Sequence, residues 1–274
     1  MPNKPFLFPF FAGMLSWLFL ASHVAGGFEV GVLEIGSAQV LWKAAFFWLC
    51  YLALEPHVRR LWPQVLISWS RLVNGQWRDP LVGQNVLLGV LAGVVVAAVN
   101  QFQVLAPAWF GLTPQPSIPS HALALDGPLA LMGWQLVQII KTPGNTLFGL
   151  MMLFLCRLVL RRGFLVSCAY VAVMTVVFTL FSEAHPVLGW FVFGIMNSLN
   201  LWVYLRLGFL AGIVMNLTLG ALMTAPLTTH FSAWYAGNGL AVVAFFLALA
   251  ALGFYTSQAG RPIFQDAPGE RTSH

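Results

Sequence analysis

The sequence predicts an all-α protein, a polytopic integral membrane helical bundle with about eight transmembrane helices and one or two interfacial helices. Two observations lead to this fold class. Of the 274 residues, 59% are hydrophobic and only 8% are charged, whereas an ordinary soluble domain has about 25% charged residues. The apolar residues also form runs of about 18 to 23, which are long enough to cross a hydrocarbon core of roughly 30 Å.

Eight apolar runs are expected to span the membrane. The first could be mistaken for a signal peptide, but its apolar stretch is longer than a signal peptide requires. The runs form one membrane domain over residues 1–256, and the cytoplasmic tail over 257–274 is expected to be disordered. The expected spans cover residues 7–25, 36–54, 83–103, 145–160, 163–182, 187–205, 207–225 and 235–256.

The segment 104–144, between the third and fourth spans, is expected to lie at the outer surface. It contains six prolines, which cannot occupy successive helix interiors because proline lacks the backbone N–H. Its one apolar piece, residues 127–140, is short and is interrupted by Gln135 and Gln138. We therefore expect this piece to form a helix that lies on the membrane or dips into it.

The positive charges predict the orientation. Most arginines lie in the connections after the second and fourth spans, or after the sixth and last spans. An eight-span path with both termini in the cytoplasm places all of them inside, as the positive-inside rule requires. The expected location is the bacterial inner membrane. The net charge of +5 is thus a topology signal, and it gives no support for nucleic-acid binding.

Residues 57–78 are expected to form a helix on the cytoplasmic membrane surface. Apolar residues recur there at helical spacing, with arginines on the other faces. Such a helix turns tryptophan and leucine toward lipid and arginine toward the headgroups. It either caps the bundle or couples the membrane domain to a cytoplasmic partner. The residues assigned to it are Arg59, Arg60, Trp62, Trp69, Arg71 and Trp77.

The seventh span carries a small or hydrogen-bonding residue at every fourth position. Such stripes let two helices approach closely, and an asparagine inside the membrane needs a partner across the contact. The stripe favours packing within the chain, with homodimerisation as the alternative. The residues assigned to helix packing are Gly208, Gly212, Asn216 and Gly220.

Three further polar residues lie inside the expected spans. Asn197 and Asn200 are one helical turn apart, which predicts a buried polar contact or, alternatively, a substrate pathway. Lys43 is the one cation inside a span. Its stem is expected to snorkel to the outer surface, or its charge to pair with Glu29 or Glu34.

Motifs for nucleotide binding, kinase catalysis, zinc proteases and serine hydrolases are missing from the sequence. No span has an acidic residue near its centre, although an ion-coupled transporter usually needs one. The sequence therefore favours a non-enzymatic protein that works through partners, with the lipid bilayer and other subunits or a second copy around it. A cofactor-binding or metal-binding subunit and a small-solute transporter are the alternatives.

Histidines supply the candidate metal ligands. Four of the six lie on the outer side under this topology, together with several carboxylates. Imidazole and carboxylate groups ligate zinc, copper or iron, and an imidazole can also bind haem or a pigment. His185 and His230 are the first candidates because both lie in short connections. The alternative is that histidines collect at membrane interfaces without binding anything.

Several motifs extend over almost the whole chain. The most specific are Tyr51 to Trp62 and Asp79 to Gly83, with His57 where tyrosine is expected. The C-terminal half adds Arg206-Leu-Gly-Phe-Leu, Pro226-Leu-Thr, Ser232-Ala-Trp-Tyr-Ala-Gly and Gly253-Phe-Tyr-Thr-Ser. Together they resemble the multi-span membrane region that follows the catalytic domain in some bacterial serine/threonine protein kinases. The resemblance implies a membrane anchor or sensor for signalling.

Overall fold

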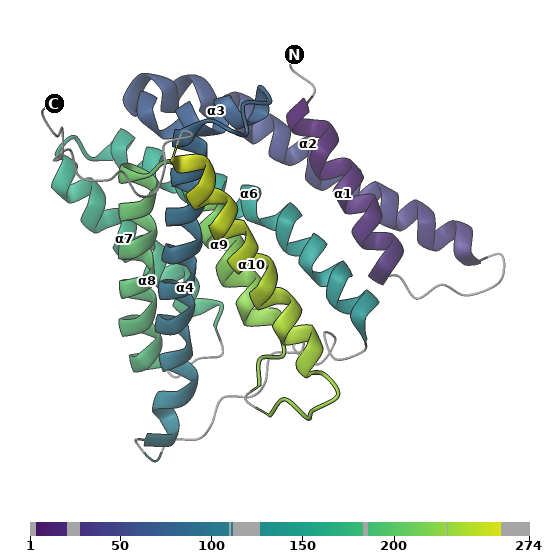
Figure 1. Ribbon diagram of the computed structural model, residues 1–274. Helices are drawn as coiled ribbons and strands as arrows, with labels where there is room; N and C mark the ends of the chain where they lie inside the picture. The colour runs from purple at the N-terminus through teal and green to yellow at the C-terminus, as the bar shows by residue number, and fades with distance from the viewer. Residues whose placement is uncertain are drawn as a thin grey trace, which may run out of the picture.

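The computed structural model describes residues 4–20, 28–109, 111, 127–182, 186–228 and 230–258. Within these ranges the regular secondary structure is helical, with no strand (Figure 1). The helices are α1 (Lys4–Leu20), α2 (Phe28–Leu61), η1 (Pro63–Leu66), α3 (Ile67–Val73), α4 (Pro80–Trp109), α6 (Pro128–Val159), α7 (Gly163–Leu180), α8 (Pro186–Arg206), α9 (Phe209–Thr224) and α10 (Ala236–Ser257).

Six of the described helices are long and apolar enough to cross a membrane, namely α2, α4, α6, α7, α8 and α10. By contrast, α1 has 17 residues and α9 has 16, which is short of the about 20 that a transmembrane helix needs. The all-helical class is therefore confirmed, with six helices that could span a membrane. The expected count of eight is not confirmed.

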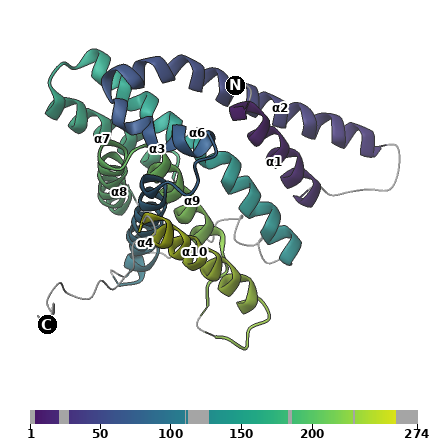
Figure 2. The same cartoon turned by 45° about the horizontal axis from the view of Figure 1, so that its top comes forward.

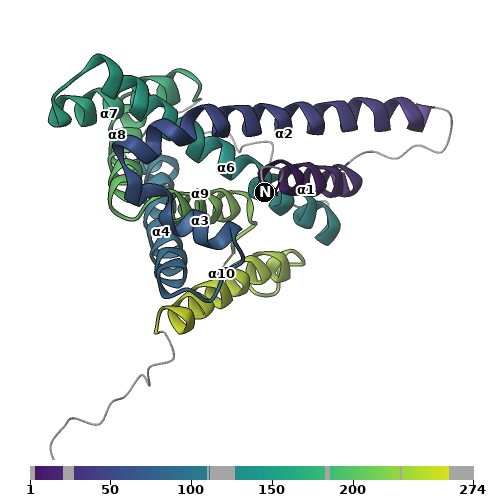
Figure 3. The same ribbon diagram turned by 90° about the horizontal axis from the view of Figure 1, so that it is seen from above.

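Helix α9 lies inside the bundle. It packs against α4 and α6, and α4 in turn packs against α10. The pair α7 and α8 stands beside this group, while α1 packs on α6 and α2 (Figure 2). Helix α2 has 34 residues, and Figure 3 shows much of it extending beyond the central helices. The start of α1, the whole of α3 and the end of α10 lie at one end of the bundle (Figure 1), which we name the α3 end.

Glycines bring α4 and α9 into backbone contact. A Cβ atom built on Gly89 would lie 2.9 Å from the carbonyl oxygen of Ala211, and one built on Gly93 would lie 2.7 Å from that of Met215. Gly93 also faces the Thr218 side chain, whose Cβ would be 2.5 Å away. Only a hydrogen in place of a side chain permits this approach, as is common where helices pack in membranes.

The expectation of a separate short helix at 127–140 is wrong, because these residues form the first half of the continuous helix α6, which as a whole is long and apolar enough to cross a membrane. Its two glutamines turn toward α9. The Gln138 Nε2 donates a hydrogen bond to the Gly220 carbonyl at 3.3 Å, and Gln135 Nε2 lies 3.5 Å from Thr224 Oγ1. The amide groups that seemed to interrupt an apolar run are thus satisfied inside the bundle, which makes a long helix possible.

Prolines also lie inside helices where breaks were expected. Pro107 lies within α4, and Pro143 within α6. Each proline removes one helical hydrogen bond, but side-chain hydroxyls and neighbouring helices can satisfy the backbone groups that are freed. Hydroxyl groups flank Pro143, where Thr142 and Thr146 each donate to the carbonyl four residues earlier. The Pro-rich segment 104–144 is therefore helical at both described ends.

The residues 57–78, expected to form one surface helix, are divided among the end of α2, the 3₁₀ helix η1 and the short helix α3. Helix α2 continues to Leu61, the 3₁₀ helix η1 follows after Trp62, and α3 ends at Val73. Pro63, at the first position of η1, has no N–H with which to continue α2. We refer to residues 62–79 as the α2–α4 connection. The helical periodicity of the apolar residues survives only within α3.

Candidate functional site

A cavity of about 430 Å³ lies between α6, α7, α8 and α9. Its lining combines carboxamides and hydroxyls with aromatic and aliphatic side chains. Among the lining residues that the structure describes, none is an aspartate, glutamate, lysine, arginine or histidine. We name it the amide cavity after its polar lining residues, which are Gln138, Thr142, Asn145, Tyr170, Asn197, Asn200, Tyr204 and Asn216.

One wall of the amide cavity is built around Tyr204, which is buried. Asn216 Nδ2 donates to the Tyr204 hydroxyl and to Thr146 Oγ1, each at 3.1 Å. The tyrosine ring fits between two glycines, since a Cβ atom would lie 2.5 Å from the ring at Gly212 and 2.8 Å from it at Gly149. The Asn216 carboxamide of α9 thereby links α8, which carries Tyr204, to α6, which carries Thr146.

The remaining amides leave hydrogen-bonding capacity toward the cavity. Asn200 Nδ2 donates to the Met196 carbonyl at 3.0 Å, and Asn197 Nδ2 lies 3.5 Å from Thr175 Oγ1. The Asn145 carboxamide has no hydrogen-bond partner among the residues that the structure describes. Because a carboxamide offers two donors and an acceptor with two lone pairs, these groups can bind a ligand that both donates and accepts.

Aromatic side chains of α6, α7 and α8 supply the apolar part of the lining. Phe178 and Phe193 stack with their ring centroids 5.9 Å apart, and Phe148 and Phe181 complete the group. A ligand with an apolar body and an uncharged polar group would match both parts of this cavity. Pockets of this composition, mostly apolar with a few convergent polar groups, are typical of small-molecule sites.

No family model, no curated protein and no solved structure matches this chain. The resemblance to the kinase-linked membrane region therefore stays a prediction.

The small-residue stripe lies along the side of α9 that faces its neighbours within the chain. Gly212 and Asn216 contact Tyr204, and a Cβ atom at Gly220 would lie 2.9 Å from Gln138 Oε1. Gly208 precedes α9 with a φ of 98°, a conformation that favours glycine. A Cβ atom there would also lie 2.7 Å from the Val65 carbonyl oxygen of η1.

The histidine site receives no support from the described residues. His230 is exposed in the connection between α9 and α10, where its backbone N–H donates to Thr228 Oγ1. His185 lies outside the described residues. Within the described ranges, no group of three histidine, cysteine, aspartate or glutamate side chains could hold a metal ion. Binding of a metal, haem or pigment at these residues stays a prediction.

The α2–α4 connection contains three tryptophans, and two of them, Trp62 and Trp69, pack against the core of the bundle. Trp69 meets Phe209 edge-on, with the ring centroids 5.3 Å apart, so it points toward α9 rather than away from the protein. Trp77 is 56% exposed and lies under the Arg78 guanidinium, 4.4 Å from its ring centroid. Trp77 is therefore the exposed member of the three, whereas Trp62 and Trp69 are half-buried.

Two other assigned arginines belong to the end of α2. Arg59 forms an ion pair with Glu55 one turn earlier, at 2.7 Å, and donates to the Ser70 hydroxyl of α3. Arg60 and Trp62 lie beside it, with Arg60 exposed and Trp62 packed against the core. The contact between Arg59 and Ser70 ties the end of α2 to α3.

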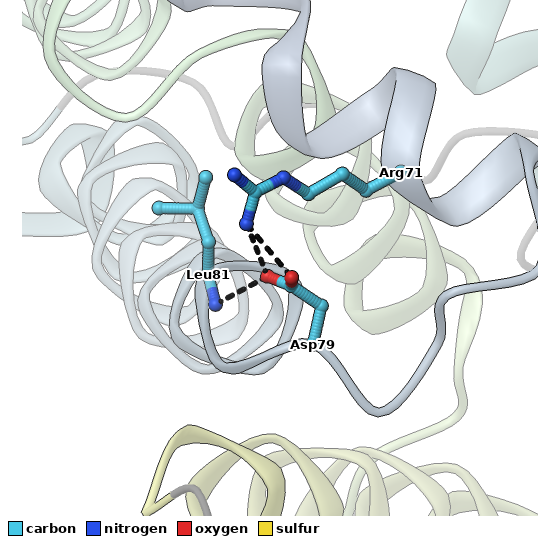
Figure 4. A network of polar contacts seen from close by, with 3 residues as sticks. All are labelled: Arg71, Asp79 and Leu81. Atoms are coloured by element: carbon cyan, nitrogen blue, oxygen red, sulfur yellow. Dashed lines mark hydrogen bonds and ion pairs between the residues drawn. The ribbon is translucent and has the colours of Figure 1, made fainter.

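An ion pair between Arg71 and Asp79 holds α3 against the start of α4 (Figure 4). Arg71 Nη1 of α3 donates to both carboxylate oxygens of Asp79, at 2.9 and 2.7 Å. Asp79 Oδ1 also accepts the backbone N–H of Leu81 at 2.9 Å, so Asp79 caps the first turn of α4. Desolvation opposes ionisation of Asp79, but these hydrogen bonds outweigh it and hold the pKa of Asp79 below its ordinary value of 3.8.

Replacing Asp79 with alanine is expected to destabilise the protein by about 1 kcal/mol, the usual cost of a lost helix cap. Asp79→Asn is the matched control, since asparagine can still cap α4 but cannot pair with Arg71. Because the folded-state pKa is lowered, the charge contributes to stability above pH 3.8, and this contribution is lost as pH falls through the lowered pKa. Melting temperatures between pH 3 and 7 should fall less steeply at the acidic end for Asp79→Asn than for the wild type, and parallel curves would contradict the prediction.

Proposed function

We propose that this chain is a non-enzymatic membrane module that senses a small uncharged ligand in the amide cavity. The observation that carries this proposal is the cavity itself, whose described lining gathers five carboxamides and two tyrosines and includes no charged side chain. Polar groups are costly inside a membrane protein unless they are hydrogen-bonded. A ligand that binds the free amide groups would offset this cost, and a charged ligand would find no counter-charge.

A physical route from the cavity to the α3 end supports a sensing role. Helix α9 carries Asn216 in the cavity wall and begins beside Gly208, which touches η1. The two positions are about 12 Å apart along the helix axis. Phe209 extends the same contact to Trp69 of α3. A shift of α9 on ligand binding would therefore act directly on the α2–α4 connection.

In this proposal the α3 end faces the cytoplasm of a bacterial cell, in the inner membrane. The arginines of the α2–α4 connection and of the connection after α6 support that orientation through the positive-inside rule. The output passes to another protein subunit or to a second copy of the chain. The resemblance to kinase-linked membrane regions supports signalling as the process that receives this output.

Benzamide tests the ligand class, because it combines an apolar ring with an uncharged carboxamide. We expect it to raise the melting temperature of the purified chain and to slow hydrogen exchange in residues 63–73. Benzoate and benzylamine, which have a similar shape but carry a charge, should do neither. Asn200→Leu should weaken benzamide binding about fivefold or more, since a lost hydrogen bond to the ligand is worth about 1 kcal/mol or more.

Ser198→Leu is the matched control for this experiment. Ser198 lies on the same helix as Asn200 and is exposed, and its hydroxyl donates to the Gly194 carbonyl of its own helix. It should bind benzamide as the wild type does. Equal binding of benzoate and benzamide, or full binding by Asn200→Leu, would refute the proposed uncharged site. Binding without any change in hydrogen exchange at 63–73 would refute the sensing role and leave a binding protein.

A small-solute transporter is the second candidate, and the same cavity is the observation that favours it. Uptake of radiolabelled benzamide into proteoliposomes distinguishes the two functions. A sensor binds without transport, so the uptake rate should match that of protein-free vesicles. Saturable uptake that Asn200→Leu abolishes would instead establish transport.

A further inference from the structure

A second cavity, separate from the amide cavity over most of its lining, lies between α2 and α6. It has a volume of about 350 Å³. Its lining is apolar except at one place, where Lys43 of α2 and Lys141 of α6 both face it. Its lining, as far as the described part of the chain shows it, includes no acidic residue. We name it the lysine groove.

The two lysines of the groove carry unbalanced positive charge. Both side chains are exposed at the surface of the chain, and both line the same cavity. Among the described residues, neither forms a salt bridge with a carboxylate. The Lys141 ammonium lies over the ring of Trp134, 5.8 Å from its centroid. Charged side chains within membrane helices are costly unless they meet an opposite charge. An anion bound between the two lysines would therefore stabilise them.

The rest of the groove runs along the two helices away from the lysines. Its α2 side continues from Lys43 to Leu54, and its α6 side continues from Lys141 to Met151. The distance along α2 is about 16 Å. Gly144 leaves space in the middle, because a Cβ atom built there would meet nothing within 4 Å. A long apolar path that begins at two cations matches a molecule with an anionic head and a hydrocarbon tail.

We propose that the lysine groove binds one anionic phospholipid, with its phosphate between Lys43 and Lys141 and an acyl chain along the apolar walls. Basic pockets between membrane helices are a known means of holding lipid phosphates. The apolar length of the groove favours a lipid over a free phosphate, which would leave most of the lining uncovered.

Native mass spectrometry of the full chain, released from mixed phosphatidylglycerol and phosphatidylcholine bilayers, tests this proposal. We expect the wild type to retain one phosphatidylglycerol, with at least a tenfold preference over phosphatidylcholine. The Lys43→Gln, Lys141→Gln double variant should lose the preference, and the corresponding Arg double variant should keep it. Unchanged preference in the Gln variant would overturn the proposal.

The acyl-chain path is tested by Gly144→Leu, which fills the groove and leaves both lysines in place. It should lower retention of phosphatidylglycerol at least fivefold. Gly237→Leu is the matched control, because Gly237 on α10 also has nothing within 4 Å of a built Cβ and lies outside the groove. Full retention by Gly144→Leu would overturn the proposal, and this result remains decisive if the Gln variant does not fold.

Glycerol phosphate distinguishes a lipid from a free phosphate compound. It carries the anionic group without the hydrocarbon chain, so it should not displace the bound phosphatidylglycerol at millimolar concentration. Complete displacement would show that the site recognises the phosphate alone, and the lipid assignment would then be wrong. Because the amide cavity uses other polar residues, failure of this proposal would leave the benzamide test unaffected.

Discussion

Replacing Gly93 with leucine is expected to destabilise the bundle by about 3 kcal/mol or more, at the upper end of the cost of overpacking. The side chain would be directed at the Met215 carbonyl oxygen, which is only 2.7 Å from a built Cβ atom, and at Thr218. Backbone atoms cannot rotate away as a flexible side chain can. Helices α4 and α9 would have to separate, and the α4–α10 packing would be disturbed with them. The melting temperature of the purified chain in one fixed detergent measures the effect.

Gly237→Leu is the control for this prediction as well. It adds the same apolar volume to a helix at a position with open space, so its melting temperature should stay close to that of the wild type. Gly93→Ala should fall between the two, since even a single carbon atom meets Thr218. A Gly93→Leu variant as stable as Gly237→Leu would mean that α4 and α9 do not pack through this glycine.

Replacing Asn216 with leucine is expected to have the second largest effect, because it changes both stability and ligand binding. The substitution removes the donor that reaches Tyr204 and Thr146. It leaves the buried tyrosine hydroxyl without this partner, which costs about 1 to 3 kcal/mol. Benzamide binding should also fall at least tenfold, because an apolar side chain replaces a polar group of the cavity wall.

A double-mutant cycle with Tyr204→Phe separates the polar contact from general packing. If the two side chains interact as described, the double variant should be more stable than the sum of the single effects predicts. A coupling energy of about 1 kcal/mol is expected for a hydrogen bond between membrane helices. Strictly additive effects would show that Asn216 and Tyr204 contribute independently.

Much of the helical arrangement could be predicted from hydropathy alone. The apolar runs at 83–103, 163–182 and 187–205 coincide closely with α4, α7 and α8. The prediction failed at α6, where two glutamines and Pro143 were interpreted as signs of a surface segment. A hydropathy scale scores each side chain as if lipid surrounded it. Gln138, however, donates a hydrogen bond to the Gly220 backbone carbonyl of α9. A sequence pattern cannot show that such a partner exists.

The candidate site was predictable only in fragments. Asn197, Asn200 and Asn216 stood out because polar residues within apolar runs are rare. Their convergence with Asn145 and Tyr204 depends on how four helices cross, and the sequence carries no local signal for that. The glycines of the stripe lie at close contacts of α9, yet nothing in their spacing indicated that Gly212 makes room for a tyrosine ring.

The length of α2 has a consequence for how the protein responds to its bilayer. A helix of 34 residues measures about 51 Å along its axis, whereas a hydrocarbon core is about 30 Å thick. The helix therefore fits only if it leans over or extends beyond the core. Since leaning is how a long helix adapts to thickness, a thicker bilayer would bring α2 more upright and would swing Pro63–Leu66 at its end. The tilt angle of α2, and with it the position of η1, would then depend on the thickness of the membrane.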